Sequence, residues 1–220
     1  MILSQLLNTM FKIREDFRPA AEIKEWMWIE SDDGMFDGPF HDWYGHHKEN
    51  ILKYVEKKRV VVQAGGGCGM YPVLLSQYFN TVYTFEPDWE SFYCLVYNCG
   101  DKKGIVKMQA ALSREHMMVG LNRNSTSNYG AHTIAEGGEL FIPALKIDDL
   151  DLQHCDLIML DVEQYEGNVL IGARQTIKKH KPILMMEGAS RYEVELHKMG
   201  YEYICSSASD ALYKPINTEK

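Results

Sequence analysis

Four acidic residues follow hydrophobic runs that have the composition of buried β-strands. In an open sheet of parallel strands, the carboxyl ends of the strands meet at one edge, and ligands bind outside that edge. We therefore expect the four side chains on one rim, where they can accept hydrogen bonds from a ligand or take up a proton. The four are Glu86, Asp161, Glu163 and Glu187.

A glycine-rich turn follows the first of the predicted strands. Val60-Val61-Val62 is a β-branched run, Gly65-Gly66-Gly67-Cys68-Gly69 follows it, and a helix is expected around Pro72. Proline is tolerated in the first turn of a helix, and glycines allow a ligand to touch the main chain. This unit predicts a site for a polar or anionic group of a nucleotide-like ligand.

From residue 60 onward the sequence alternates between strand-like and helix-like segments. Such alternation is typical of an α/β domain with a doubly wound, mainly parallel sheet and helices on both faces. We expect strands at 81–85, 105–109, 157–160 and 182–186, short strands at 117–121 and 140–145, and a terminal hairpin at 201–205 and 211–214.

The first 59 residues are expected to form a helical extension or lid, and residues 60–220 the ligand-binding domain. Apolar spacing predicts helices over 1–17, 20–29 and 49–58. The first helix could pack on the core of the domain, form a homodimer contact or cover a substrate.

Three histidines and an aspartate lie within His41-Asp42-Trp43-Tyr44-Gly45-His46-His47. Adjacent His46 and His47 would point in different directions on a helix, and no recognised ligand spacing is present. We assign no metal here, and a lid that touches the ligand pocket is an alternative to a plain surface role.

Composition excludes several classes of partner. The 220 residues carry a formal charge of -8, and the basic residues are scattered, which disfavours nucleic acid. No apolar run has the ~18 residues of a membrane span, and no signal peptide is evident. Five cysteines without a C-x-x-C pair are expected to be reduced, which favours a cytoplasmic protein.

The glycine order is G-x-G-x-G rather than the G-x-G-x-x-G of dinucleotide-binding folds. With Glu86 after the second strand, this pattern resembles class I S-adenosylmethionine-dependent methyltransferases. Later segments, in order between about residues 60 and 190, resemble the FkbM family of those enzymes. These segments are Val82-Tyr83-Thr84-Phe85-Glu86-Pro87-Asp88 with Leu95 and Asn98, Lys146-Ile147-Asp148-Asp149-Leu150, Ile158-Met159-Leu160-Asp161-Val162-Glu163 with Glu166, Leu170 and Gly172-Ala173, and Pro182-Ile183-Leu184-Met185-Met186-Glu187.

The resemblance implies a seven-stranded Rossmann-like sheet, S-adenosyl-L-methionine as cofactor, and binding residues along the glycine turn and the following strands. The methionine end of the cofactor is expected at the glycine turn, the ribose at Glu86 and the adenine near Gln109-Ala110. The expected cofactor-binding residues are Gln63, Gly65, Gly67, Gly69, Met70, Glu86, Pro87, Gln109, Ala110 and Asp161.

Two positions depart from the family pattern. Gln63 stands where the first motif usually carries an acid, so an amide hydrogen bond replaces the charge pairing with the ligand's ammonium group, or the pairing comes from elsewhere. Gln164-Tyr165 stand where Gly-Ala is usual, which adds bulk beside the expected reaction centre.

The function that the resemblance implies is O-methylation of a hydroxyl on a small molecule or a sugar. Glu163 or Asp161 is expected to take the hydroxyl proton, with His132 as a weaker candidate, and no metal is assigned. The alternatives are an NAD-dependent oxidoreductase on a similar sheet and a catalytically silent S-adenosylmethionine-binding module. A protein or nucleic-acid acceptor is a further alternative.

Overall fold

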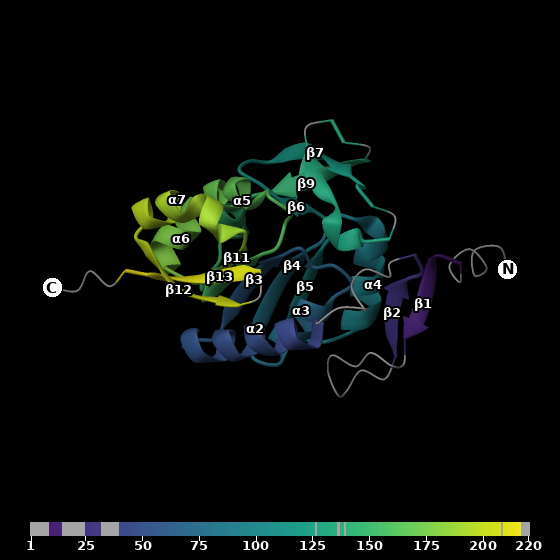
Figure 1. Cartoon of the computed structure of the whole chain (residues 1–220), viewed down its shortest axis with the longest axis horizontal. Helices are drawn as coiled ribbons and strands as arrows, with labels where there is room; N and C mark the ends of the chain where they lie inside the picture. The colour runs from purple at the N-terminus through teal and green to yellow at the C-terminus, as the bar shows by residue number, and fades with distance from the viewer. Residues whose placement is uncertain are drawn as a thin grey trace.

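A computed structural model describes residues 9–14, 25–31, 40–125, 127–135, 137–138, 140–207 and 209–216. In these residues a central sheet lies between two groups of helices, and a smaller sheet lies beside it (Figure 1). The predicted α/β fold with a largely parallel sheet and helices on both faces is confirmed.

Seven strands of the described chain form the central sheet, in the order β12-β13-β11-β10-β3-β4-β5. The run from β11 to β5 is parallel throughout, and β13 is antiparallel to both β11 and β12. The strands are β3 (Val60–Ala64), β4 (Thr81–Phe85), β5 (Ile105–Met108), β10 (Leu157–Leu160), β11 (Ile183–Glu187), β12 (Tyr201–Ser207) and β13 (Asp210–Pro215).

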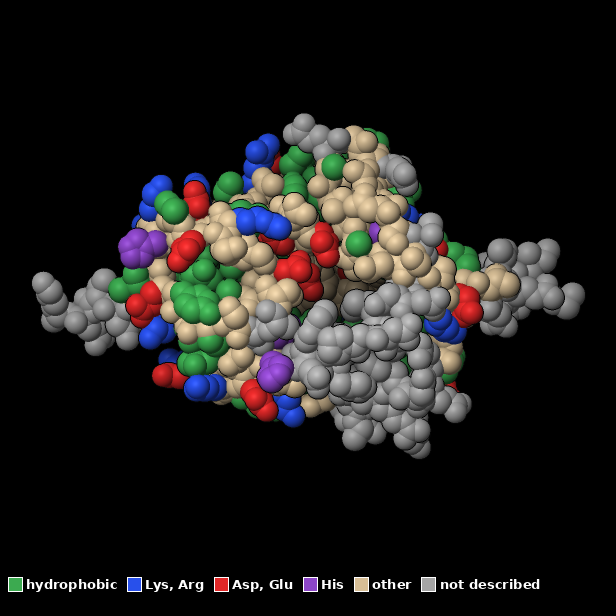
Figure 2. Space-filling view, in the orientation of Figure 1, with side chains coloured by type: hydrophobic (Ala, Val, Ile, Leu, Met, Phe, Trp, Pro, Cys, Tyr) green, Lys and Arg blue, Asp and Glu red, His purple; other side chains and the backbone are tan. Residues whose placement is uncertain are grey.

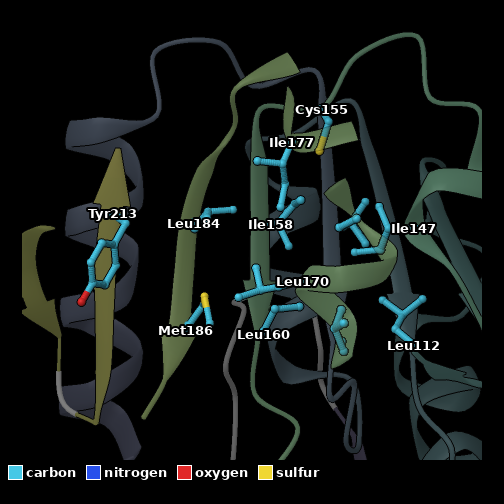
Figure 3. Close-up of a cluster of buried hydrophobic side chains, with 14 of the residues drawn as sticks. Leu112, Ile147, Cys155, Ile158, Leu160, Leu170, Ile177, Leu184, Met186 and Tyr213 are labelled. Atoms are coloured by element: carbon cyan, nitrogen blue, oxygen red, sulfur yellow. The ribbon is translucent and has the colours of Figure 1, made fainter. Parts of the chain in front are cut away.

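Alternate residues of the central strands face opposite helical layers, as the two-residue period of a strand requires. Val61 and Met159 pack with α2 (Phe40–Tyr54) and α3 (Met70–Ser76), the layer next to α4 (Trp89–Cys99). Val62 and Ile158 face α5 (Glu166–Gly172), α6 (Arg174–His180) and α7 (Glu193–Lys198), in the cluster drawn in Figure 3. The strand residues are buried on both sides, so the sheet is the rigid support of its loops.

A four-stranded sheet, in the order β6-β9-β7-β8, lies beside the central sheet. Its inner side chains, such as Val119 and Ile142, form a cluster of their own. The strands are β6 (Ala111–Leu112), β7 (Met117–Asn122), β8 (Thr133–Ala135) and β9 (Leu140–Leu145), and short 3-10 turns occupy η1 (Tyr129–Ala131), η2 (Ile147–Leu150) and η3 (Ala189–Tyr192). The strands predicted at 117–121 and 140–145 are confirmed.

In the segments predicted as helices over 1–17 and 20–29, residues 9–10 are helical, but residues 11–14 and 26–29 are not. Residues 11–14 and 26–29 are instead β1 (Phe11–Arg14) and β2 (Trp26–Ile29), paired antiparallel. The reason is tertiary, because Trp26 and Trp28 are buried against α4. Residues 1–8, 15–17 and 20–24 of these segments lie outside the described residues.

Asn98 of α4 fixes this hairpin to the glycine turn. Its amide oxygen accepts from the Met27 N–H at 2.7 Å, and its amide nitrogen donates to the carbonyls of Met27 (2.8 Å) and Cys68 (2.7 Å). A side-chain amide thereby pairs with β2 much as a neighbouring strand would. The N-terminal hairpin is thus anchored next to the predicted ligand site.

Helix α2 begins at Phe40, before the predicted start at 49, and ends at Tyr54. None of the five cysteines forms a disulfide, and four of them are buried. Among the helices that the structure describes, none has the length and apolar character to cross a membrane.

Candidate functional site

An open cavity lies at the carboxyl edge of the central sheet, between the glycine turn and the four-stranded sheet; its empty space, with the solvent at its mouth included, is about 970 Å³. Acidic side chains gather beside a hollow at the centre of this face (Figure 2). Its lining includes the predicted residues Gly65, Gly67, Met70, Glu86, Pro87, Ala110, Asp161 and Glu163. Sequence reasoning missed three aromatic lining residues, Trp28, Tyr71 and Tyr129, because nothing in their spacing distinguishes them from core positions.

The glycine turn is held against the ends of two strands. The N–H groups of Gly65 and Gly66 both donate to the Phe85 carbonyl, at 3.1 and 2.9 Å. A Cβ on Gly65 would lie 1.9 Å from the Asp161 carbonyl oxygen, whereas a Cβ on Gly67 would meet no protein atom within 4 Å. Gly65 is therefore required by the fold, and Gly67 leaves open space that a ligand can occupy.

Gly69 and Gln109, two of the predicted binding residues, do not line the cavity. Gly69 has a φ of 97°, and a Cβ at this position would lie 3.2 Å from the Leu95 Cα of α4, so this glycine serves helix packing. Gln109 is exposed, and only its neighbour Ala110 lies in the lining.

Gln63 is also outside the lining and is fully buried. Its amide nitrogen donates to the Gly65 carbonyl at 2.6 Å, and its amide oxygen accepts from the Thr84 hydroxyl at 2.6 Å. Gln63 thus braces the glycine turn from behind. The amide hydrogen bond to a ligand that we considered for Gln63 has no support in this arrangement.

Glu86 closes the opposite side of the turn. One carboxylate oxygen accepts from the Gly67 N–H at 2.7 Å and the other from the Asp88 N–H at 2.8 Å. Burial raises the pKa of Glu86 to about 7, against the opposing effect of these two hydrogen bonds. A carboxyl that is partly protonated near neutral pH can both accept and donate a hydrogen bond to a ligand hydroxyl.

Three of the predicted acids come together at the rim. Carboxylate oxygens of Asp161, Glu163 and Glu187 lie within 4.8 Å of one another. Strand β10 ends at Leu160, so the alternation of a strand does not set the direction of the Glu163 side chain. That direction depends instead on the left-handed backbone at Glu163 (φ 52°) and Gln164 (φ 73°). Oxygen atoms of this kind could hold a divalent cation, but acids cluster in this way without one.

Burial and mutual repulsion make these acids hard to ionise. Burial, followed by the charges of Asp210 and Glu187, raises the pKa of Asp161 well above its usual value, although its side chain keeps some exposure to the cavity. Burial and the charge of Glu187 raise the pKa of Glu163, which Arg191 partly offsets. Such carboxyls are stronger bases when ionised than exposed ones.

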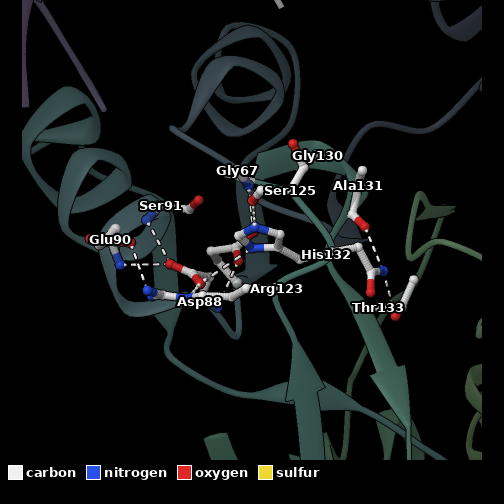
Figure 4. A network of polar contacts seen from close by, with 12 residues as sticks. Gly67, Asp88, Glu90, Ser91, Arg123, Ser125, Gly130, Ala131, His132 and Thr133 are labelled. Carbon is white, nitrogen blue, oxygen red and sulfur yellow. Dashed lines mark hydrogen bonds and ion pairs between the residues drawn. The ribbon is translucent and has the colours of Figure 1, made fainter. Parts of the chain in front are cut away.

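A network of buried ion pairs and hydrogen bonds joins α4 to segments next to the four-stranded sheet (Figure 4). Asp88 caps α4 by accepting from the Glu90 N–H at 2.8 Å, and its other oxygen pairs with Arg123 Nε at 2.8 Å and lies 3.3 Å from His132 Nδ1. Arg123 also pairs with Glu90 at 3.0 Å. The segments that follow β7 and precede β8 are thereby tied to α4.

His132 lines the cavity within this network. Burial by itself would lower the pKa of His132, but the contacts with Asp88 and with the Ser125 carbonyl outweigh it and raise the pKa above its usual value. Because both ring nitrogens face protein acceptors, His132 is better placed to hold the wall than to take a proton from a ligand.

A family model described as "Methyltransferase FkbM domain" matches residues 73–212, well over half of the chain. The chain belongs to the FkbM methyltransferase family. Among solved structures, methyltransferase FkbM from Methylobacillus flagellatus KT is similar, with a TM-score of 0.52 and 16% identity over 80% of this chain. The likeness covers 53% of that protein's length, and at this identity it shows the fold alone. A search of curated proteins finds no match.

Two other similar structures are also methyltransferases by description. A putative S-adenosyl-L-methionine-dependent methyltransferase from Methanococcus maripaludis has a TM-score of 0.49 and 11% identity, over 84% of this chain and 90% of that one. A ribosomal protein L11 methylase from Lactobacillus delbrueckii subsp. bulgaricus has a TM-score of 0.47 and 12% identity, over 81% and 80%.

Membership of the FkbM family implies S-adenosylmethionine as the cofactor, and the residues present fit it. The open space next to Gly67, called the Gly67 cradle below, would be filled by the Cβ of any other residue. Glu86, Pro87 and Ala110 line the cavity beyond this space. An elongated nucleoside can thus lie along the strand ends, from the acidic rim to Ala110. When bound, S-adenosylmethionine supplies a methyl group activated by its sulfonium.

Replacement of Gly67 by valine is expected to abolish cofactor binding, because the new side chain would fill the cradle. Isothermal titration of the Gly67→Val variant with S-adenosylhomocysteine measures this directly. The matched control is Gly200→Val, which also has a positive φ (81°, against 50° at Gly67) and open space around its Cβ but lies at the α7–β12 turn. Unchanged affinity in Gly67→Val, or equal loss in both variants, would contradict the placement.

Stability is expected to fall with rising pH through the buried carboxyl of Glu86. The folded protein keeps a proton up to about pH 7 that the unfolded chain releases near pH 4.5, so the free energy of unfolding decreases across that window and levels off above it. In Glu86→Gln, the decrease in the free energy of unfolding between pH 4.5 and 8 should be smaller by about 3 kcal/mol than in the wild type, as measured by urea unfolding. Glu115→Gln, an exposed control, should keep the wild-type slope. Parallel curves for wild type and Glu86→Gln would show that Glu86 titrates normally.

Proposed function

We propose that this chain transfers a methyl group from S-adenosylmethionine to a hydroxyl of a small molecule or a sugar. The observation that carries the proposal is the meeting, in one cavity, of the Gly67 cradle with the carboxyls of Asp161 and Glu163. The cradle supports cofactor binding, and the carboxyls provide proton acceptors beside it. Membership of the FkbM family supports methyl transfer as the reaction.

The protein has two tasks in such a reaction. The cavity walls align the acceptor oxygen with the methyl group, which lowers the entropic cost of the encounter. Glu163 or Asp161 takes the proton that the acceptor hydroxyl loses as its oxygen bonds to the methyl carbon. The neighbouring acids favour this step because proton uptake relieves their repulsion.

Tyr165 supports a restricted acceptor site. It lines the cavity next to the acidic rim, and its hydroxyl lies 3.0 Å from the hydroxyl of the buried Ser113. A ring held at this point takes up space that Gly-Ala, the usual family residues, would leave open. We therefore expect a small or flat acceptor group at the rim.

The alternatives have less support. An NAD-dependent oxidoreductase would need the third glycine of the dinucleotide fingerprint, which the turn lacks. The departures at Gln63 and Gln164-Tyr165 raise the alternative of a silent binding module. Gln63 braces the turn and takes no place in the cavity, so only Gln164-Tyr165 still bears on that alternative. A cytoplasmic location and a homodimer through the N-terminal segment stay predictions.

Glu163→Gln is expected to lower kcat by a factor of roughly 10² to 10⁴, because the amide keeps the size of the side chain but cannot take a proton. The assay measures S-adenosylhomocysteine release with S-adenosylmethionine and a panel of sugars and hydroxylated metabolites. Affinity for S-adenosylhomocysteine should stay within a few fold. Full turnover in Glu163→Gln, with wild-type turnover present, would exclude Glu163 as the base.

A further inference from the structure

The turn that carries Glu163, called the 162–165 turn below, has a backbone that its residues rarely adopt. The Tyr165 N–H donates to the Val162 carbonyl at 3.3 Å and closes the turn. The two central residues, Glu163 and Gln164, have φ values of 52° and 73°, and neither is a glycine. Turns of this kind favour Gly, Asn or Asp at both central positions. Other contacts must therefore hold the 162–165 turn in place.

Glu166 provides such contacts from the first turn of α5. Its carboxylate Oε1 accepts from the Val162 N–H at 3.3 Å and from the Gln164 N–H at 3.2 Å. These are the N–H groups of the residues on either side of Glu163. The helix dipole favours an acid in the first turn of a helix even when that acid is exposed, but Glu166 is 0% exposed. Its burial and its two acceptor contacts indicate a role in holding the turn.

Tyr192 of η3 contacts the second carboxylate oxygen of Glu166. The Tyr192 hydroxyl lies 3.3 Å from Glu166 Oε2 and 3.4 Å from the Gln164 carbonyl oxygen. Its ring packs closely on Gly167, where an added Cβ would lie 2.8 Å from the Tyr192 Cε1. Both oxygens of Glu166 thus have donors, and the side chain cannot rotate away from the turn without losing these hydrogen bonds.

Glu163, the residue between the two bonded N–H groups, faces the cavity. It lines the cavity with Asp161, and its carboxylate lies within 4.8 Å of those of Asp161 and Glu187. Glu166 lies outside the lining. If the turn relaxed to right-handed φ values, the Glu163 carboxyl would change direction. Glu166 can therefore affect proton transfer without touching a ligand.

The charge of Glu166 acts on Glu163 as well. Burial raises the pKa of Glu163, the charges of Glu187 and Glu166 raise it further, and Arg191 partly offsets them. Burial also raises the pKa of Glu187 and of Asp161, and the charge of Glu166 contributes to both. A carboxylate next to other negative charges is a stronger base.

We propose that Glu166 is a positioning residue whose buried carboxylate, held by Tyr192, fixes the 162–165 turn and directs Glu163 to the acceptor hydroxyl. This deepens the proposed function, because it rests on Glu163 as the group that takes the proton. One acid meets the acceptor, and a second acid behind the cavity wall orients the first.

The first test measures turnover of a panel member that the wild type methylates. Glu166→Ala should lower kcat roughly 10- to 100-fold, because Glu163 is no longer held in line, while the KM for S-adenosylmethionine changes only a few fold. Gln164→Gly, added to Glu166→Ala, should recover part of this loss, because glycine adopts a φ of 73° without strain. Glu193→Ala, at an exposed acid in the first turn of α7, is the matched control and should keep the wild-type kcat.

The second test needs no methyl acceptor. Glu166→Gln keeps an oxygen that can accept both N–H groups but removes the charge. In the ligand-free chain labelled with ¹³C-glutamate, the carboxyl signal of Glu163 is followed by NMR against pH and assigned by its loss in Glu163→Gln. Its midpoint should move to lower pH in Glu166→Gln, because a charge that opposed ionisation is gone, and should stay in place in Glu193→Gln.

Three results would overturn the inference. The first is wild-type kcat in Glu166→Ala, and the second is an equal loss of kcat and of S-adenosylhomocysteine affinity, which would indicate general disruption. The third is an unmoved Glu163 midpoint in Glu166→Gln, which decides the matter if Glu166→Ala does not fold or no panel member is methylated. Full turnover in Glu163→Gln would refute the proposed proton acceptor and the inference together, whereas full turnover in Glu166→Ala alone would refute only the inference.

Discussion

The close approach of Gly65 to the end of β10 is the constraint on which the site depends. The Asp161 N–H donates to the Ala64 carbonyl at 3.2 Å, and the Asp161 carbonyl lies where a Cβ on Gly65 would have to be. This contact places the glycine turn and the acidic rim side by side. Because β3 and β10 are central, buried strands, the two halves of the site cannot drift apart without disrupting the core.

The carboxyl groups around this contact are held under conditions that oppose ionisation. Glu86 and Asp210 each have a pKa raised by burial to about 7, and Asp161 and Glu163 are raised by burial and by their acidic neighbours. Such an arrangement lowers stability at neutral pH, and it is typical of sites where proton transfer or a cationic ligand relieves the repulsion. A ligand with an ammonium and a sulfonium would supply that relief.

The sequence predicted the elements that repeat a simple pattern and missed those set by tertiary contacts. The strand-end acids were found because parallel strands deliver their carboxyl ends to one edge. Strand alternation could not place Glu163, since two left-handed residues after β10 redirect it. The β1–β2 hairpin was missed because its aromatic residues fit either a helix or a strand, and only the packing against α4 and Asn98 decides between them. The contacts of His47 with Tyr71 and Asp210 could not be predicted, because these residues are distant in sequence.

The decisive measurement for the placement of the cofactor is a crystal structure of the chain soaked with S-adenosylhomocysteine. We expect the ligand sulfur between Gly67 and the acidic rim, the amino-acid end at Asp161, and the adenosine along Glu86, Pro87 and Ala110. Density for the nucleoside elsewhere on the surface, or with its adenine at the acidic rim, would contradict this binding mode.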